Sequence, residues 1–323
     1  MSHAIRIHST GGPEVLVWEE VEVGKPGPGQ VLVRNIAVGL NYVDTYYRTG
    51  LYSVPLPTIL GREGAGVVEA VGPKVKDFKR GDRVAYVDPS GSYAELLLRP
   101  ADRLVKIPAG VSERTAAAMM LKGMTAQYLL RRTYKVKKGD TILVHAAAGG
   151  VGQILCQWGR HLGARVIGTV GSEAKAALAK KAGCKHVLII GRDKLVESVK
   201  QLTKGAGVPV VYDGVGKDTF MDSLDCLMPL GMMVTYGNAS GAVPPFSPVI
   251  LSQKGSLFLT RPTLANYIAT REDLVRSARE LFAVVKSGAV KIAVNQTYPL
   301  REAAQAHRDL ESRKTTGSTV LLP

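Results

Sequence analysis

The chain has 323 residues, 46% of them hydrophobic and 21% charged, a composition that suits two buried cores and argues against extended disorder. No apolar run reaches the roughly 18 residues of a membrane-spanning helix, and residues 1–10 lack the apolar core of a signal peptide, so we expect a soluble, cytoplasmic protein. The formal net charge of +15 is compatible with an anionic cofactor or with a nucleic acid.

The first third of the chain is predicted to be rich in short strands. Residues 31–38 are dominated by β-branched side chains and are too few for a typical helix, and residues 66–71 and 82–87 follow the same pattern. Glycine and proline interrupt the chain between these segments, as they do in compact β-rich domains. We therefore expect a β-rich first domain over residues 1–122.

Strands and helices alternate between residues 123 and 262. This alternation is typical of a doubly wound parallel sheet with right-handed crossovers, so we expect an α/β second domain. The predicted strands cover residues 141–145, 165–170, 186–190, 209–212, 232–236 and 256–260, and the first two predicted helices cover residues 150–162 and 173–182.

The pattern changes again after Pro262. Apolar residues recur at helical spacing over residues 271–287, and Gly288 is a suitable helix stop. Residues 319–322 are predicted to form a last strand. We expect residues 263–323 to return to the first domain.

The three cysteines, Cys156, Cys184 and Cys226, are widely spaced in the sequence. They form no C-x-x-C pair, which argues against a structural zinc site and a disulfide framework, so we expect each to be a buried thiol. The six histidines show no ligand spacing either. His145 lies in a predicted buried strand, where a structural role is expected.

The strongest motif is the segment 146–152, Ala-Ala-Ala-Gly-Gly-Val-Gly, between a predicted buried strand and a predicted helix. Glycines permit a tight turn and the close approach of a pyrophosphate, and the helix N-terminus supplies free N–H groups and the positive end of its dipole. A glycine-rich segment alone is often an ordinary turn. In this strand–turn–helix context it predicts dinucleotide binding by Gly149, Gly150 and Val151.

The end of the next strand favours NADPH over NADH. An NAD-dependent enzyme usually presents Asp or Glu about 20 residues beyond the glycines, where the carboxylate binds the ribose 2′-hydroxyl. Here the strand is followed by Gly171 and Ser172, and Lys175 lies in the first turn of the next helix, where it can meet a 2′-phosphate. Glu173 is the competing feature, because it too can approach the ribose.

Three segments together resemble medium-chain dehydrogenase/reductases: residues 145–152, Gly61-Arg62-Glu63-Gly64-Ala65-Gly66 and Gly39-Leu40-Asn41-Tyr42-Val43-Asp44. Residues 41–46, 236–241 and 259–262 narrow the resemblance to zeta-crystallin-like quinone oxidoreductases of the bacterial type, over nearly the whole chain. The resemblance implies an α/β fold class with a GroES-like β-rich catalytic domain, formed by residues 1–122 and 263–323. It also implies a Rossmann NADPH-binding domain at residues 123–262, a cofactor cleft between the two, and a homodimer.

The resemblance also concerns site residues. It implies that Asn41 and Tyr46 lie near the nicotinamide. Further cofactor contacts are implied for Thr125, Gly149, Gly150, Val151, Gly171, Ser172, Lys175, Tyr236, Gly237, Asn238, Ser240 and Arg261. Relatives often carry an aromatic residue or histidine against the adenosine where Ile190 stands, so a hydrogen bond is lost there.

Zinc is not expected. Zinc-dependent relatives place a cysteine ligand at the position of Asn41 and a histidine ligand at that of Arg62. Neither asparagine nor arginine is a suitable zinc ligand here. A quinone accepts a hydride and then a proton that solvent can supply, so this chemistry needs positioning more than a metal. Glu63 is expected to orient the domain interface.

The catalytic candidates are Asn41, Asp44, Tyr46 and Tyr52, with Tyr46 or Tyr52 as a hydrogen-bond donor to a substrate oxygen. The competing interpretation is that these tyrosines are ordinary packing aromatics. We predict reduction of a quinone by NADPH, by hydride or single-electron transfer. The alternatives are an enone or alkenal reductase on the same scaffold and, from another class, an RNA-binding protein with a vestigial cofactor fold.

Assembly is predicted from residues 256–260, the expected final strand of the parallel sheet. This edge would expose unpaired backbone groups beside Leu257 and Leu259, and exposed edges are usually covered or paired. Two copies pairing around a two-fold axis would give a homodimer. Cover by a loop or by the C-terminal segment is the alternative.

Overall fold

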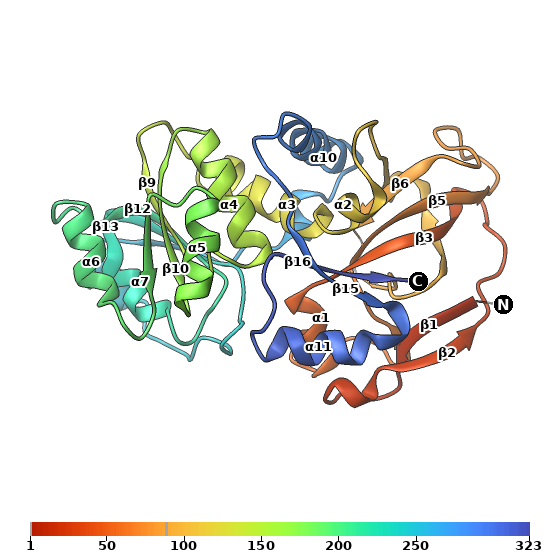
Figure 1. The fold of residues 1–323 in the computed structure, drawn as a ribbon, viewed down its shortest axis with the longest axis horizontal. Helices are drawn as coiled ribbons and strands as arrows, with labels where there is room; N and C mark the ends of the chain where they lie inside the picture. Colours follow the sequence, from red (N-terminus) through yellow and green to blue (C-terminus); the bar gives the residue numbers. More distant parts are fainter. Residues whose placement is uncertain (1, 88–89) are drawn as a thin grey trace. The chain divides into compact units, whose positions relative to one another are not determined.

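The computed structural model describes residues 2–87 and 90–323, and the chain forms two compact units. The first unit consists of Met1–Met124, Ile268–Lys286 and Ile292–Pro323. The second consists of Thr125–Tyr267 and Ser287–Lys291. Each unit is described separately below (Figure 1).

The first unit contains a seven-stranded sheet in the order β15-β16-β3-β5-β6-β8, with β7 paired to β3. Its strands are β3 (Gln30–Leu40), β5 (Glu63–Val71), β6 (Arg83–Val87), β7 (Leu96–Pro100), β8 (Leu104–Lys106), β15 (Val294–Pro299) and β16 (Ser318–Leu322). Because β16 pairs antiparallel with β3, the C-terminal segment completes this sheet. The three strands predicted in the first third and the one predicted at residues 319–322 are confirmed.

A smaller sheet and five helices complete the first unit. The sheet has the order β2-β1-β4, with β1 (Ser2–Ile7), β2 (Val17–Val21) and β4 (Thr58–Ile59). The helices are α1 (Tyr42–Arg48), α2 (Glu113–Ala117), α3 (Met120–Tyr128, which runs into the second unit), α10 (Arg271–Lys286) and α11 (Ala303–Glu311). Leu274 and Leu281 of α10 are fully buried, and a Cβ at Gly123 would lie 2.4 Å from Leu281, so this glycine admits the predicted helix.

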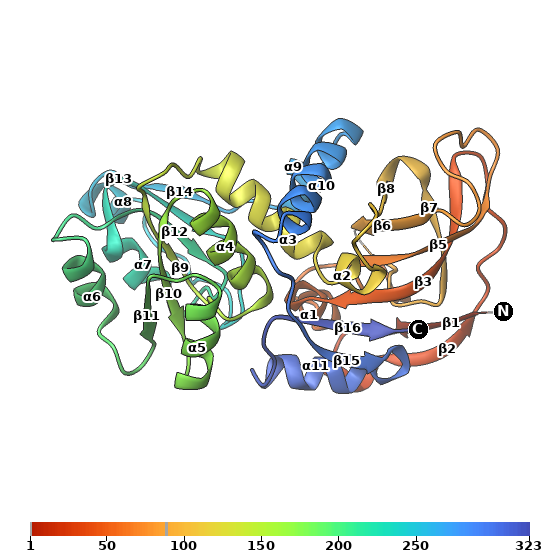
Figure 2. The same ribbon diagram turned by 45° about the horizontal axis from the view of Figure 1, so that its top comes forward.

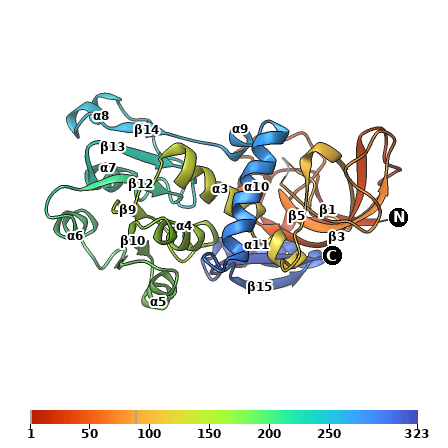
Figure 3. The same cartoon turned by 90° about the horizontal axis from the view of Figure 1, so that it is seen from above.

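The second unit is the doubly wound sheet that the sequence predicts. All its paired strands are parallel, in the order β11-β10-β9-β12-β13-β14, which the labels of Figure 3 follow from β14 to β10. The strands are β9 (Thr141–Val144), β10 (Arg165–Val170), β11 (His186–Ile189), β12 (Val208–Asp213), β13 (Leu227–Thr235) and β14 (Phe258–Thr260). In chain order this is 3-2-1-4-5-6, so the order reverses between β9 and β12, where such sheets bind ligands.

Helices cover both faces of this sheet. Figures 1 and 2 show α6 and α7 on one side and α4 and α5 on the other. The helices of the unit are α4 (Gly150–His161), α5 (Glu173–Lys181), α6 (Leu195–Leu202), α7 (Phe220–Cys226), α8 (Val249–Gln253) and α9 (Leu264–Tyr267). The two predicted helices, α4 and α5, each end one residue earlier than expected. On the α6 and α7 side the core gathers Leu143, Ile167, Val211 and Met233 from four strands.

β14 is the edge strand, as predicted. Of its apolar side chains, Phe258 faces outward and Leu259 faces the core. Ser256 has a left-handed φ of 54°, so the strand starts at Phe258 rather than at Ser256. Leu257 is buried in the core and Leu259 packs against it, whereas Phe258 is 56% exposed. Leu257 and Leu259 therefore belong to the core, and their replacement by lysine would not test pairing at this edge.

Among the described residues, no helix combines the length and the apolar character that crossing a membrane requires.

Candidate active site

The glycine-rich loop of the second unit joins β9 to α4. Ala146 takes a left-handed φ of 50°, and the Gly149 N–H donates to its carbonyl oxygen at 2.9 Å, which closes a tight turn. A Cβ on Gly152 would lie 2.2 Å from that same oxygen, so only glycine lets the helix start this close to the turn. The first turn of α4 contains no acidic residue, so no carboxylate of that turn competes with an anion for its N–H groups.

His145, just before this loop, is structural, as predicted. It is fully buried, with Nδ1 at 2.9 Å from the Thr169 hydroxyl and Nε2 at 2.9 Å from the Ser223 hydroxyl. Since Ser223 donates its own proton to the Thr219 carbonyl, its oxygen accepts from Nε2. Burial lowers the pKa of His145, so the neutral ring links β9 to β10 and α7.

At the end of β10 the chain leaves room for a ligand. No atom lies within 4 Å of the position that a Cβ on Gly171 would take, and Ser172 is the N-cap residue of α5. Glu173, the competing feature in the sequence, forms an ion pair with Arg192, which lies just beyond β11. Ile190, also beyond β11, is 41% exposed.

Arg192 is a residue that sequence reasoning missed. It also contacts Asp193, whose carboxylate accepts the Ile189 N–H at 2.7 Å and so fixes the loop. The available signal was a basic residue directly after the third strand, next to the end of β10, where the sequence predicted cofactor contacts. Its distance of 19 residues from Glu173 hid the pairing.

The loops after β12 and β13 are held by both backbone and side-chain hydrogen bonds, and the Ser240 N–H donates to the Val215 carbonyl at 2.8 Å. The buried Asp213 carboxylate accepts the Val215 N–H at 2.7 Å, and the Ser240 hydroxyl donates to the Val215 carbonyl at 2.9 Å. A Cβ on Gly237 would lie 2.4 Å from the Gly214 carbonyl oxygen, so the segment Tyr236–Asn238 requires glycine at its centre. At the end of β13 the Thr235 hydroxyl is buried and makes no hydrogen bond to the described residues.

Two more predicted cofactor residues gather around Tyr128 in the same unit. The Tyr128 ring stacks on Tyr267 at 4.3 Å between centroids, and its hydroxyl forms a hydrogen bond with Thr125. Burial raises the pKa of Tyr128, and the nearby positive charge of Arg261 partly opposes the shift. Thr125 thus contacts Tyr128, and the Arg261 charge is close enough to act on the same hydroxyl.

In the first unit, the catalytic candidates lie on and after α1, which Asn41 caps at its N-terminus. The Asp44 carboxylate accepts the Asn41 backbone N–H at 2.8 Å, a helix-capping contact that fixes the start of α1. The Tyr46 and Tyr52 rings meet edge to face, 5.4 Å apart, and the Tyr52 N–H donates to the Tyr46 carbonyl at 3.0 Å. The structure therefore brings Asn41, Asp44, Tyr46 and Tyr52 together.

Glu63 sits under Asn41 and is fully buried. Its Oε1 accepts from Asn41 Nδ2 at 2.8 Å and from Lys122 Nζ at 2.7 Å, and its Oε2 accepts the Leu121 N–H at 2.7 Å. These three donors satisfy the buried carboxylate. Glu63 was expected to orient a domain interface; within this unit it orients Asn41.

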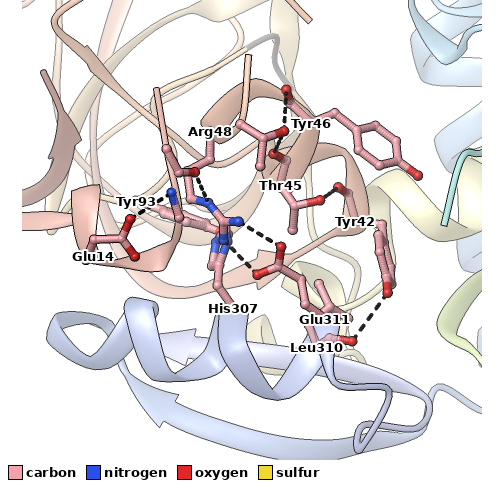
Figure 4. A network of polar contacts seen from close by, with 12 residues as sticks. Glu14, Tyr42, Thr45, Tyr46, Arg48, Tyr93, His307, Leu310 and Glu311 are labelled. Atoms are coloured by element: carbon pink, nitrogen blue, oxygen red, sulfur yellow. Dashed lines mark hydrogen bonds and ion pairs between the residues drawn. The ribbon is translucent and has the colours of Figure 1, made fainter. Parts of the chain in front are cut away.

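A second buried network links α1 to α11 (Figure 4). The Tyr93 hydroxyl donates to the Asp44 carboxylate at 2.9 Å and lies 3.2 Å from His307 Nε2. Arg48 Nη1 lies 3.0 Å from His307 Nδ1, and the guanidinium forms a bidentate pair with Glu311 at 2.7 and 2.9 Å. Figure 4 shows Tyr46 extending from α1 away from this cluster.

The two ends of the network have opposite pKa shifts. Burial raises the pKa of Asp44 to about 7, although the Asn41 N–H and the Tyr93 hydroxyl oppose the shift. Burial and the Arg48 charge lower the pKa of His307 to about 3, so its ring is neutral. The neutral ring accepts from Arg48 at Nδ1 and donates from Nε2 to Tyr93.

The position of the absent zinc ligand is filled by a different contact. Arg62 donates to the Tyr47 hydroxyl at 2.9 Å and lies over the Tyr47 ring, 5.1 Å from its centroid. Within residues 2–87 and 90–323, no three His, Cys, Asp or Glu side chains are arranged to hold a metal ion. All three cysteines are buried free thiols, as predicted, and the fold brings Cys156 and Cys184 to 3.2 Å between sulfurs.

Two family descriptions match the chain: "Alcohol dehydrogenase GroES-like domain" over residues 27–109 and "Zinc-binding dehydrogenase" over residues 150–283. A quinone oxidoreductase of Pseudomonas aeruginosa is 52% identical over the full length of both chains. A 2-haloacrylate reductase of a Burkholderia species is 50% identical, over 100% of this chain and 99% of the relative. The crystal structure of Escherichia coli quinone oxidoreductase complexed with NADPH is 48% identical with a TM-score of 0.96, covering 99% of this chain and 100% of the other.

Proposed function

The chain belongs to the medium-chain dehydrogenase/reductase family, among its zeta-crystallin-like quinone oxidoreductases, and on that premise we propose that it reduces a quinone with NADPH. The observation that carries this proposal is the full-length identity to quinone oxidoreductases, together with a glycine loop whose geometry admits a pyrophosphate. NADPH supplies the reducing equivalents. The first unit is proposed as the catalytic domain and the second as the NADPH-binding domain.

Phosphate binding is assigned to two places in the second unit. Gly150 and Val151 present the N-terminal N–H groups of α4 to the pyrophosphate, while Gly149, whose own N–H closes the turn, lets the pyrophosphate approach the backbone. Lys175 and Arg192 bind the 2′-phosphate, and the Arg192–Glu173 ion pair occupies the one carboxylate that would otherwise favour a ribose hydroxyl. The open space at Gly171 and the neighbouring Ser172 suit the ribose.

The remaining cofactor contacts are carried over from the resemblance. Thr125, which is hydrogen-bonded to Tyr128, and Arg261, whose charge acts on the same hydroxyl, are proposed to contact the cofactor. The segment after β13 is proposed to contact the nicotinamide half of the cofactor through Tyr236, Gly237, Asn238 and Ser240. The buried Thr235 hydroxyl at the end of β13 is proposed to bind a polar group of the same ligand.

Three residues of the first unit are proposed to act at the reacting ring. Asn41 and Tyr46 contact the nicotinamide, and Tyr46 or Tyr52 donates a hydrogen bond to the substrate oxygen as negative charge develops there. The edge-to-face contact of these two tyrosines supports their acting together, because each ring fixes the other.

We propose that the reaction does not depend on zinc. Asn41 is engaged with Glu63, and the Arg62 guanidinium carries a permanent positive charge that repels a cation. Turnover should therefore persist after prolonged dialysis against a strong chelator, with metal content measured in parallel. Loss of turnover that added Zn²⁺ restores would refute this part of the proposal.

The experiment that tests the function is a panel of acceptors at fixed NADPH, with NADPH oxidation followed optically. The panel contains ortho- and para-quinones, enones and 2-haloacrylates. The second candidate function is reduction of an activated alkene, which the identity to a 2-haloacrylate reductase favours. Turnover of quinones supports the main proposal, whereas turnover confined to enones or haloacrylates replaces it with the alternative.

We also propose a cytoplasmic homodimer that pairs through β14, the edge of the parallel sheet. Phe258 is the residue to change, because it is exposed, whereas lysine at Leu257 or Leu259 would disrupt the core. Phe258→Lys should yield monomers in sedimentation velocity with an unchanged circular dichroism spectrum. A wild-type chain that sediments as a monomer at micromolar concentration contradicts the proposal.

A further inference from the structure

Every N–H group of Asn41 is engaged inside the first unit. Its backbone N–H donates to Asp44, and its amide nitrogen donates to Glu63 at 2.8 Å and to the Gly39 carbonyl at 3.3 Å. The Glu63 carboxylate also accepts from Lys122 and from the Leu121 N–H. A carboxylate with three donors around it offers Asn41 no proton, so the amide must turn its nitrogen, not its oxygen, toward Glu63.

The surroundings are built to keep Glu63 in place. A Cβ on Gly39 would lie 2.3 Å from Glu63 Oε1 and 2.4 Å from the Ala117 carbonyl oxygen, so glycine at this position makes room for the carboxylate. Glu63 is fully buried, and the Lys122 side chain is 7% exposed. Lys122 also donates to the Leu40 carbonyl at 3.1 Å, which ties the ion pair to β3, directly before Asn41.

From this geometry we infer that Glu63 is a positioning residue that makes Asn41 a pure hydrogen-bond acceptor toward its ligand, where it recognises the carboxamide N–H of the nicotinamide. This inference rests on the proposed function, in which Asn41 contacts the nicotinamide. It assigns donation to the substrate oxygen to Tyr46 or Tyr52, since Asn41 has no N–H left to give. The carboxamide is the ligand group beside the reacting ring that carries N–H donors.

The test compares two reduced cofactors that differ in that group. One is NADPH, and the other is its 3-acetylpyridine analogue, in which a methyl group replaces the carboxamide nitrogen. Dissociation constants are measured by fluorescence titration without acceptor, so no turnover is needed. The wild-type chain should bind NADPH about fivefold to tenfold more tightly than the analogue, the usual effect of one hydrogen bond.

Asn41→Ala should reduce this preference to less than about twofold. Asn35→Ala is the matched control. Asn35 lies on β3, the strand that ends directly before Asn41, is equally buried, and donates to the Ser92 and Ala94 carbonyls. It should lower stability and leave the cofactor preference at its wild-type value. A wild-type preference near one, or an unchanged preference in Asn41→Ala, overturns the inference.

Glu63 is tested by a double-mutant cycle. Glu63→Gln leaves one oxygen for three donors, so Asn41 loses its fixed orientation, and the cofactor preference should fall at least twofold when Asn41 is present. In the Asn41→Ala background the same substitution should leave the preference unchanged. An equal effect in both backgrounds would show that Glu63 acts on the fold and not through Asn41. Absence of NADPH binding by the wild-type chain would instead refute the proposed function itself.

Discussion

In the second unit, the loops at the carboxyl ends of β9, β12 and β13 depend on glycines that admit no Cβ, at Gly152 and Gly237, with added hydrogen bonds from the buried Asp213 carboxylate. Around α1 in the first unit, networks of buried side chains shape the site, with Glu63 at the centre of one network and Asp44 at the end of the other. An added Cβ should disrupt the second unit where glycine packs against backbone, whereas the first unit should be sensitive to changes of charge or of hydrogen-bonding sense. The two regions should therefore fail in different ways.

The largest expected effect is steric and belongs to the second unit. In Gly152→Val the new Cβ would lie 2.2 Å from the Ala146 carbonyl oxygen, an atom that cannot move without breaking the turn. We expect a loss on the order of 3 kcal/mol or more in the free energy of unfolding and no measurable NADPH binding. Urea unfolding and fluorescence titration measure the two quantities.

Gly149→Ala is the matched control for this prediction. Its Cβ would lie 3.2 Å from the same oxygen, and its φ of −78° suits any residue. The loss in unfolding free energy should stay below about 1 kcal/mol. Equal losses in the two variants would mean that close approach at Gly152 does not shape the loop.

In the first unit, the free energy of unfolding should depend on pH, and His307 and Asp44 should contribute to it in opposite directions. His307 has a folded pKa of about 3 against 6.5 for its model value, so the unfolded chain binds the extra proton and stability falls as pH drops through that window. Asp44 has a folded pKa of about 7 against 3.8, so the folded chain holds the proton and stability rises as pH drops from 7 to 3.8. Between about pH 6.5 and 4 the two contributions cancel.

Asp44→Asn should break this balance. The amide oxygen still accepts from the Asn41 N–H and from Tyr93, while the titration of Asp44 is gone. The variant should lose about 1.4 kcal/mol of stability per pH unit, relative to wild type, as pH falls from 6.5 to 4. Urea unfolding at pH 7, 6, 5 and 4 measures this slope, and parallel curves for the two proteins would contradict the opposing shifts.

The same contrast decides what the sequence could predict. The segment from β9 to α5 was predicted nearly residue by residue, because a strand, a glycine turn and a helix are local patterns. Asn41 meets Glu63 across 22 residues, Tyr93 meets His307 across 214, and Arg48 meets Glu311 across 263. No local pattern encodes such pairs, so the networks that position Asn41 emerge only from the fold.

The directions of the side chains in residues 256–260 could not be predicted for a similar reason. The apolar run 256–260 gives a strand, but the left-handed backbone at Ser256 sets which residues face the core. β13 likewise begins at Leu227, five residues before its predicted start, because tertiary pairing with β12 extends it across Pro229 and Gly231. In both cases packing, rather than residue preference, fixes the outcome.

A smaller effect concerns Lys175 and Arg192, the charged residues proposed to bind the 2′-phosphate. Lys175→Ala and Arg192→Ala should each weaken NADPH binding by about tenfold and leave NADH binding nearly unchanged, because only NADPH carries the 2′-phosphate. Glu173→Gln should leave NADPH binding at least as tight, since it releases Arg192 from its ion pair. Equal losses for NADPH and NADH in the Lys175 or Arg192 variant would remove that residue from the phosphate site.

The smallest effect is a gain in stability at Ala146. This residue holds a left-handed φ of 50°, which costs an L-residue about 1–2 kcal/mol and glycine nothing, while glycine adds about 0.5–1 kcal/mol of backbone entropy to the unfolded chain. The difference predicts that Ala146→Gly raises the free energy of unfolding by about 0.5 kcal/mol. Ala147→Gly, one residue on and without a positive φ, keeps the entropy cost and loses a buried methyl group, so it should be destabilising. Opposite signs for these two neighbours in urea unfolding would show that the turn holds backbone strain, and two losses would show that it does not.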